Sequence, residues 1–297
     1  MADLVHVRIP VSDGLTLHAV TAGAENAPLV VLLHGFPEFW HSWRRQIPAL
    51  AHAGFRVIAP DQRGYNLSDK PKGVRAYRLD ALTADVAAIL DWAGRDKAVI
   101  VGHDWGGGVA WRFAMDYPER TERLVVMNAP HPVAFARELK RWSQRRRSWY
   151  MMYFQIPWLP ETLFSLSPTQ TASISFRNVA VRKDAFSDND LQAYAQAMGQ
   201  PGALRSMIHW YRAGFRYPPA KRVRPIESPT LLIWATEDVA LGVELTRGLE
   251  KWIPNLTVHY VNNCGHWVQN EAPDEVNTAL LEFLQADSPL ASVAEQG

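Results

Sequence analysis

Two kinds of hydrophobic pattern run along the chain and predict two kinds of β-strand. Near the N-terminus, residues 4–9 (LVHVRI) and 15–20 (LTLHAV) alternate apolar and polar side chains on either side of a turn, as a half-exposed antiparallel pair does. Later runs are almost continuously apolar, which is typical of strands in a parallel sheet covered on both faces. These denser runs are residues 28–33, 55–59, 98–101, 123–127, 230–234 and 256–260.

Helical periodicity fills the intervals between many of the dense runs. In residues 79–94 (LDALTADVAAILDWAG) the apolar positions recur every three to four residues, which predicts an amphipathic helix. Alternation of strands and helices is typical of an α/β fold. We therefore predict a mostly parallel, doubly wound sheet with helices on both faces.

One long interval, residues 132–222, contains no dense apolar run and is rich in aromatic side chains. We interpret it as a helical cap (lid) domain inserted into a core made of residues 1–131 and 223–297. Such a cap would lie over the carboxyl ends of the strands, where open α/β sheets bind ligands. The aromatic residues of the interval include Trp142, Trp149, Tyr150, Tyr153, Trp158, Tyr194, Trp210 and Tyr211.

Composition limits the classes of partner. The 31 basic and 30 acidic residues give a net charge of +1, so no global field attracts nucleic acid or an anionic membrane. The one basic cluster, residues 140–149 (KRWSQRRRSW), is interpreted as a solvated helix face, with a docking patch as the alternative. A single cysteine, Cys264, excludes an internal disulfide and fits a reducing compartment.

Targeting signals and a tail complete the bulk description. The N-terminal residues lack an apolar signal core, and no apolar run approaches the ~18 residues of a membrane span. We therefore expect a cytoplasmic protein with no membrane or nucleic-acid partner, either a monomer or a homodimer. Residues 286–297 (ADSPLASVAEQG) are predicted to form an irregular tail.

The segment VIVGHDWGGGVAWRF, residues 99–113, has the form of a nucleophile elbow with an unusual residue at its tip. In esterases the turn reads G-x-S-x-G, whereas here Asp104 replaces the serine. The glycines Gly102, Gly106 and Gly107 permit a tight turn and close packing of helix on sheet. An alternative is that Asp104 only caps the following helix.

Candidate partners for Asp104 follow two later strands. A nucleophilic carboxylate forms an ester, which needs a histidine to activate water and a second carboxylate to orient that histidine. Asp238 follows the run 230–234 and His266 follows the run 256–260, in the chain order nucleophile, acid, histidine. Glu237 is the alternative acid, and Asn128 occupies the other strand end where an acid could sit. Capping and loop packing are the structural alternatives for Asp238 and His266.

The loop LLHGFPEFW, residues 32–40, is the candidate for the other half of an oxyanion hole. Ester hydrolysis passes through an oxyanion that needs preorganised donors, and the backbone N–H groups of Phe36 and Trp105 are the candidates. Pro37 would fix this loop, with a cis bond as one possibility. Phe36, Pro37 and Trp105 are also predicted to contact the substrate.

Four motifs spread over nearly the whole chain resemble the α/β-hydrolase superfamily, and within it the epoxide hydrolases. They are HGFPE, DQRGYNLSDKP, GHDWGG and CGHWVQNEAP. In the epoxide-hydrolase family two cap tyrosines hold the epoxide oxygen, and their surroundings resemble MMYFQIPWLPE and ALRSMIHWYRAGFR here. The resemblance therefore implies this role for Tyr153 and Tyr211, which are protonated at neutral pH because the tyrosine pKa is about 10.

The predicted activity is hydrolysis of an apolar epoxide to a vicinal diol. Asp104 would form an alkyl ester that water activated by His266 hydrolyses, with no cofactor and no metal. The haloalkane dehalogenases share the aspartate nucleophile, and the Trp105 indole would then bind halide, although Phe36 stands where some of them place an asparagine. Fluoroacetate dehalogenases are also similar, but they have an arginine directly after the nucleophile and another arginine one turn further on. Trp105 and Gly108 occupy those two positions here. A non-catalytic binding protein is the third possibility, but no triad member is missing.

Overall fold

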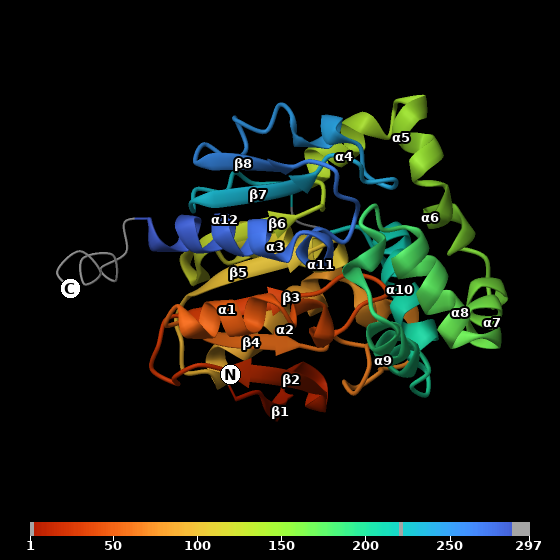
Figure 1. Cartoon of the computed structure of the whole chain (residues 1–297), viewed down its shortest axis with the longest axis horizontal. Helices are drawn as coiled ribbons and strands as arrows, with labels where there is room; N and C mark the ends of the chain where they lie inside the picture. Colours follow the sequence, from red (N-terminus) through yellow and green to blue (C-terminus); the bar gives the residue numbers. More distant parts are fainter. Residues whose placement is uncertain (1–2, 220–221, 287–297) are drawn as a thin grey trace.

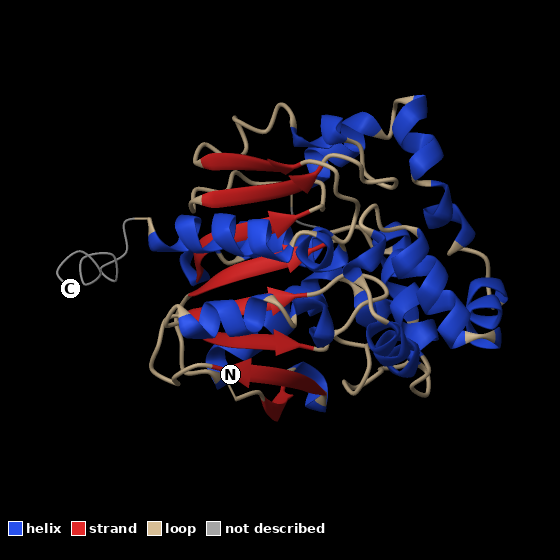
Figure 2. Ribbon diagram, in the orientation of Figure 1, coloured by secondary structure: helices blue, strands red, loops and turns tan. Residues whose placement is uncertain are grey.

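The computed structural model describes residues 3–219 and 222–286 and contains one eight-stranded sheet. Its strand order is β1-β2-β4-β3-β5-β6-β7-β8, in which β2 is antiparallel to both of its neighbours and the remaining pairs are parallel (Figures 1 and 2). Every predicted run coincides with a strand, so the mostly parallel sheet is confirmed. The strands are β1 Val5–Pro10, β2 Thr16–Ala22, β3 Leu29–Leu33, β4 Arg56–Pro60, β5 Ala98–His103, β6 Thr121–Met127, β7 Thr230–Ala235 and β8 Leu256–Val261.

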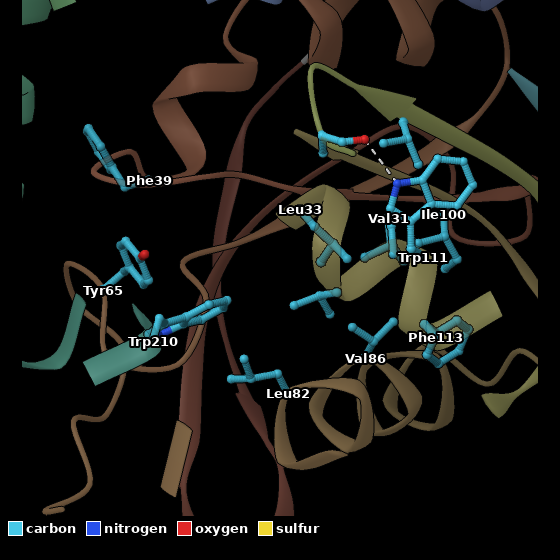
Figure 3. Packing of buried hydrophobic residues seen from close by; sticks show 14 of the residues in the cluster. Val31, Leu33, Phe39, Tyr65, Leu82, Val86, Ile100, Trp111, Phe113 and Trp210 are labelled. Carbon is cyan, nitrogen blue, oxygen red and sulfur yellow. Dashed lines mark hydrogen bonds between the residues drawn. The ribbon is translucent and has the colours of Figure 1, made fainter. Parts of the chain in front are cut away.

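Helices cover both faces of the sheet, as the dense apolar runs require. Helices α1 (Gln46–His52) and α12 (Pro273–Gln285) lie in front of the sheet in Figure 1, while α2 (Leu79–Trp92) and α3 (Trp105–Asp116) lie behind it. Successive side chains of a strand point to opposite faces. In β3, therefore, one alternate set packs with α1 and α12, and the other set packs with α2 and α3. The α2–α3 side is shown in Figure 3.

The packing of α3 on the sheet positions the elbow. The buried Trp111 of α3 donates its indole N–H to the carbonyl oxygen of Ala129 over 3.1 Å, which ties the helix to the segment after β6 (Figure 3). Phe113 of the same helix is fully buried, as is Ile100 in β5. Large buried aromatic side chains contribute strongly to core stability. The packing of α3 on the core thus fixes the position of its first residue, and with it that of Asp104, which directly precedes the helix.

The last strand differs from its prediction. A strand covered on both faces was expected for 256–260, but most β8 residues are partly or fully exposed. The reason is that β8 is the edge strand and has a hydrogen-bonded neighbour, β7, on one side only. The prediction of a strand was correct, and the prediction of burial on both faces was wrong.

The interval between β6 and β7 is helical, as predicted, and within its described part it contains no strand. Its helices lie beyond the carboxyl ends of the parallel strands, on the right in Figures 1 and 2. The exact cap limits, 132 and 222, stay a prediction. The helices are α4 Pro132–Glu138, α5 Trp142–Arg147, α6 Trp149–Tyr153, α7 Leu159–Leu166, α8 Pro168–Ser173, α9 Asp188–Met198 and α10 Ala203–Arg216, with a π-helical turn at Ile174–Asn178.

Short elements complete the description. Helix α11 (Val268–Glu271) precedes α12, and 3-10 turns occur at Ser12–Gly14, Trp40–Trp43, Val74–Tyr77, Pro118–Arg120, Lys183–Ala185 and Val243–Thr246. Of the predicted tail, all residues after Ala286 lie outside the described part of the chain. Among the residues described, no helix has both the length and the apolar character needed to cross a bilayer.

Candidate active site

Asp104 stands at a sharp turn between the end of β5 and the start of α3. Its backbone has φ 49° and ψ −120°, a conformation that side chains other than glycine rarely adopt and that concentrates at functional sites. A Cβ on Gly106 would lie 2.1 Å from the Leu33 carbonyl oxygen, so only glycine lets α3 approach β3 this closely. Asp104 makes no side-chain capping hydrogen bond to α3, which excludes the simple helix-cap alternative.

The structure brings the three predicted triad side chains together. His266 Nδ1 lies 2.7 Å from Asp238 Oδ2, and His266 Nε2 lies 3.7 Å from Asp104 Oδ2. All three side chains come from turns at the carboxyl ends of β5, β7 and β8. The imidazole therefore lies between two carboxylates, tightly bound to one and close to the other.

Asp238 is held in place by four groups. Its Oδ2 accepts from Asn128 Nδ2 at 2.8 Å as well as facing His266, and its Oδ1 accepts the backbone N–H groups of Ala240 and Leu241. Asn128, expected only as an alternative acid position, thus supports the acid instead. Glu237, the other alternative, is exposed to solvent.

Burial and neighbouring charges shift the pKa values of the three triad side chains in opposite directions. Burial disfavours the charged imidazolium, but the carboxylates of Asp238 and Asp104 outweigh it and raise the pKa of His266 to about 9. Burial alone would raise the pKa of Asp238, yet His266 and Asn128 bring it below its ordinary value. For Asp104 burial dominates and raises the pKa, against the opposing effect of His266. Of the two carboxylates, Asp238 is therefore the more readily ionised.

The predicted oxyanion hole surrounds the Asp104 carboxylate. The backbone N–H of Phe36 donates to Asp104 Oδ1 over 2.8 Å, and the backbone N–H groups of Phe36 and Trp105 both act to lower the pKa of this carboxylate. The Phe36–Pro37 peptide bond is cis. A Cβ on Gly35 would lie 2.5 Å from Asp104 Cβ, so glycine is required for this loop to reach the elbow.

Tyr211 of α10 reaches the site as expected. It is buried, with its ring centroid 5.1 Å from Phe36 and 5.0 Å from Trp105. The Trp105 ring packs edge-on against Tyr211, with the two ring planes 88° apart. Burial and the nearby Asp104 charge raise the pKa of Tyr211 well above its usual value. The phenol is therefore a protonated donor beside the nucleophile.

A second tyrosine, Tyr150, lines both cavities that meet at Asp104, whereas the predicted Tyr153 lines only the larger one. Tyr150 contacts Tyr211 with ring centroids 5.9 Å apart, and burial together with the charges of Asp104 and Asp238 raises its pKa far above the usual value. The pKa of Tyr153 is raised by burial and by Glu161, a residue of the cap. The reason is that Tyr153 lies one helical turn further along α6. Two tyrosines three residues apart were visible in the sequence, but not which turn faces Asp104.

Two cavities meet at Asp104, Tyr150 and Tyr211. The larger, of about 930 Å³, is lined also by Phe36, Pro37, Tyr153 and Trp267. The smaller, of about 320 Å³, extends past Trp105 between α3 and the start of the cap and is lined mainly by apolar side chains. The three predicted substrate contacts therefore all line one cavity or the other. Within the described residues, no group of three or more His, Cys, Asp or Glu side chains could hold a metal ion.

A buried polar network that the sequence reasoning missed supports the histidine loop. His103 Nδ1 lies 2.7 Å from Glu38 Oε2, and His103 Nε2 lies 2.9 Å from the backbone carbonyl oxygen of His266. Glu38 also accepts hydrogen bonds from Gln269 and Ser42. Burial opposes its ionisation, but these partners lower the pKa of Glu38 to about 2. A satisfied network of this kind rigidifies its surroundings. The signal was present in the sequence, since His103 adjoins Asp104 and Glu38 follows the oxyanion loop.

Comparison with known proteins agrees with this architecture. Residues 28–273 match the model of the alpha/beta hydrolase fold family. The chain is 41% identical over 275 residues to the AB hydrolase superfamily protein YfhM of Bacillus subtilis, covering 92% of this chain and 96% of the relative. The chain therefore belongs to the α/β-hydrolase family.

Within that family, the similarity is to epoxide hydrolases. Epoxide hydrolase 4 of Mus musculus is 40% identical over 292 residues, covering 95% of this chain and 80% of the relative. Epoxide hydrolase 1 of Caenorhabditis elegans is 39% identical over 273 residues, covering 90% of this chain and 67% of the relative. A crystal structure of a mutant epoxide hydrolase from Bacillus megaterium superposes with a TM-score of 0.86 at 31% identity, covering 95% of this chain and all of that one.

Proposed function

We propose that this protein hydrolyses epoxides to vicinal diols, with Asp104 as the nucleophile and without a cofactor. The observation that carries the proposal is the arrangement around one point: a carboxylate, a charge-paired histidine and two protonated tyrosines line a common cavity. The similarity to named epoxide hydrolases supports the same activity. A related structure from Bacillus megaterium carries a naphthyloxy-propanediol product. The aromatic cavity walls here suit a similar aryl-bearing epoxide.

In the first step, an oxygen of Asp104 attacks a ring carbon of the epoxide. The new C–O bond forms as the ring C–O bond breaks, and the departing oxygen takes a proton from Tyr150 or Tyr211. Their raised pKa values keep both phenols protonated until that moment. General acid catalysis of this kind typically accelerates a reaction by about 10² to 10⁴-fold. The product of this step is an alkyl ester of Asp104.

In the second step, His266 removes a proton from water, and the resulting hydroxide attacks the ester carbon. Esterification removes the negative charge of Asp104, one of the charges that raise the pKa of His266, so the histidine becomes a better proton acceptor when a base is needed. The N–H groups of Phe36 and Trp105 stabilise the tetrahedral oxyanion. Collapse expels the diol as an alkoxide, which takes the proton held by His266, and the proton of the regenerated Asp104 carboxyl group returns to the tyrosinate left by the first step.

The dehalogenase alternative is disfavoured by the site itself. A departing halide needs N–H donors, and the Trp105 indole would have to supply one. The Trp105 ring packs edge-on against Tyr211, and the phenol-bearing residues Tyr150 and Tyr211 line both cavities that meet at Asp104. The tyrosines match a leaving oxygen, which needs a proton.

The decisive experiment is intact-mass analysis of His266→Gln with styrene oxide. We expect the protein mass to increase by one substrate molecule, because the ester forms but is not hydrolysed. Asp104→Ala is the matched control and should show no adduct. Absence of an adduct in His266→Gln, with wild-type protein still producing diol, would contradict the ester mechanism. Release of halide from a 1-haloalkane without any diol from styrene oxide would contradict the epoxide assignment.

A further inference from the structure

The basic cluster of the cap has a regular outward face. Trp142, Arg145 and Arg146 are spaced i, i+3 and i+4 along α5, which places them on one side of that helix, and Trp149 is the first residue of α6. All four are exposed, and the two indoles are 71% and 65% accessible. Two large indoles therefore flank two guanidinium groups on a surface open to solvent. We call the surface formed by Trp142, Arg145, Arg146 and Trp149 the Trp–Arg face.

The opposite side of α5 is anchored to the core, so the orientation of this face is fixed. The buried Gln144 donates to the Ala240 carbonyl oxygen over 2.8 Å and accepts from the Gly242 backbone N–H over 3.2 Å. It also donates to the hydroxyl of Ser148, which is buried as well. The side chains of Trp142 and Trp149 are consequently held on the solvent side of the cap, away from the core.

Three of the four residues of the Trp–Arg face line the larger cavity where it is open to solvent. Trp142, Arg146 and Trp149 line that cavity together with two exposed aliphatic residues, Ile174 and Val239. In Figure 1, α5, α6 and α7 follow one another along the outer edge of the cap. The entrance to the Asp104 site is thus bordered by apolar and cationic side chains together.

The charge of this region is strongly one-sided even though the chain is nearly neutral. Residues 139–160 contain five basic side chains and no acidic one. Of these five, Arg141 pairs with Glu138. Arg145 and Arg146, however, form no ion pair within the described part of the chain. The net charge of +1 conceals a local positive field at the cavity mouth.

We propose that the Trp–Arg face binds the surface of an anionic lipid bilayer. Indoles favour the boundary between water and acyl chains, and arginines beside them attract anionic headgroups. A second copy of the chain is a poorer occupant, because a two-fold contact would bring the arginines of both copies together. Nucleic acid would use the cations and indoles but would leave the exposed Ile174 and Val239 without a partner.

This placement has a consequence for substrate entry that rests on the proposed function. An apolar epoxide dissolves in a bilayer, and the mouth of the cavity would face that bilayer directly. The substrate would then pass from lipid to Asp104 without crossing bulk water. Membrane binding itself does not depend on catalysis, so the binding test below is independent of the proposed activity.

Vesicle co-sedimentation of the purified protein tests the proposal. We expect the wild-type protein to sediment with vesicles of phosphatidylcholine and phosphatidylglycerol but weakly with phosphatidylcholine alone, and raised salt should release it. The double substitution Arg145→Glu with Arg146→Glu should weaken this binding by about tenfold or more. Trp142→Ala with Trp149→Ala should weaken it on the anionic vesicles as well.

Matched controls separate a local surface from overall charge. Lys97→Glu with Lys251→Glu alters the net charge equally on exposed residues outside the cap, and Trp92→Ala removes a partly exposed indole of α2. Both should retain wild-type binding. Arg145→Gln with Arg146→Gln replaces the glutamate variant if thermal unfolding shows that variant to be misfolded.

Three results would overturn the proposal. The first is wild-type protein that does not sediment with the anionic vesicles. The second is equal loss of binding in the control variants and in the variants of the face. The third is a sedimentation-velocity dimer that the Arg145→Glu and Arg146→Glu substitutions dissociate, which would assign the face to a second copy.

Discussion

The core side and the cap side of the active site are built in different ways. On the core side, Asp104, Asp238 and His266 each follow a strand, and backbone or side-chain hydrogen bonds hold them. On the cap side, Tyr150 and Tyr211 come from helices, and aromatic contacts hold them at ring distances of 5–6 Å. The core side is fixed by hydrogen bonds with defined directions, and the cap side by packing, which leaves more freedom of position.

This difference indicates which reaction step a substitution on each side of the site should affect. In the proposed mechanism, the groups that form and hydrolyse the ester belong to the sheet edge, and the proton donors belong to the inserted helical layer. We therefore expect core substitutions to abolish whole steps and cap substitutions to alter the rate of ring opening. The following predictions test that division, beginning with the largest expected effect.

Substitution of the core nucleophile should have the largest effect. Asp104→Ala should lower kcat for styrene oxide by about 10⁴-fold or more, because no ester can form. Diol formation measured by chromatography checks this result. Thermal unfolding confirms that the variant is folded. Residual activity within about tenfold of wild type would show that Asp104 is not the nucleophile.

Substitutions of the two tyrosines of α6, Tyr150 and Tyr153, should have clearly different effects on the rate of ester formation. Tyr150→Phe should slow the single-turnover formation of the ester by about 10²-fold, because it removes a proton donor. Tyr153→Phe is its matched control one helical turn away and should leave the rate nearly unchanged. Rapid-quench mass analysis measures both rates. The reverse outcome would restore Tyr153 as the donor and contradict the position of α6.

The core charge pair should make stability depend on pH. The pKa of His266 is raised from 6.5 to about 9, so the folded state binds more protons than the unfolded state in that interval. The stabilisation is complete below pH 6.5 and is lost as the pH rises through about 9, and its upper bound is about 3 kcal/mol. Urea unfolding at the two pH values measures it.

Asp238→Asn should flatten this dependence, because it removes the charge that contributes most to the raised pKa of His266. Asp96→Asn, an exposed carboxylate far from the site, is the control and should retain the wild-type slope. If Asp238→Asn and wild-type protein lose equal stability between the two pH values, the charge pair does not raise the pKa of His266.

The smallest expected effect concerns an arginine that organises the cap. Arg212 of α10 donates to the carbonyl oxygens of Phe154 and Ile156 and pairs with Glu161, which links α10 to the end of α6. Lysine cannot reproduce this forked geometry. Arg212→Lys should therefore displace Tyr150 and lower kcat by about tenfold.

The exposed Arg205 lies on the same helix, and Arg205→Lys is the matched control. It should retain the wild-type kcat and KM. Steady-state kinetics of both variants decide the matter. Equal kcat values for the two variants would show that the Arg212 contacts do not position the cap tyrosines.

The sequence predicts the core side well because strand ends can be located from hydrophobic runs. Asp104, Asp238 and His266 follow the runs at β5, β7 and β8, and the carboxyl ends of parallel strands meet at one edge. No comparable rule orients the cap. Tyr150 and Tyr153 share one motif and one helix, and only tertiary packing decides which one faces Asp104.

Long-range polar contacts were equally hidden from the sequence. The contact of His103 with Glu38 joins residues 65 positions apart, and the bond of Asn128 to Asp238 spans 110. Their residue types suggest hydrogen bonding but do not specify a partner. The local patterns therefore predict the elements, and the register of the folded sheet decides these pairs.

The unequal environment of the two Asp104 oxygens has an isotopic consequence. Oδ1 is held by the Phe36 backbone N–H, so Oδ2 is the oxygen free to bond to carbon. In the proposed mechanism, hydrolysis of the ester releases Oδ2 within the diol, and an oxygen from water replaces it on Asp104. In H₂¹⁸O the first diol made by each enzyme molecule should carry no heavy oxygen, and later ones should. If this labelling pattern is found, one carboxylate oxygen of Asp104 is exchanged in every turnover, and each enzyme molecule carries an oxygen atom from the water used in its previous turnover.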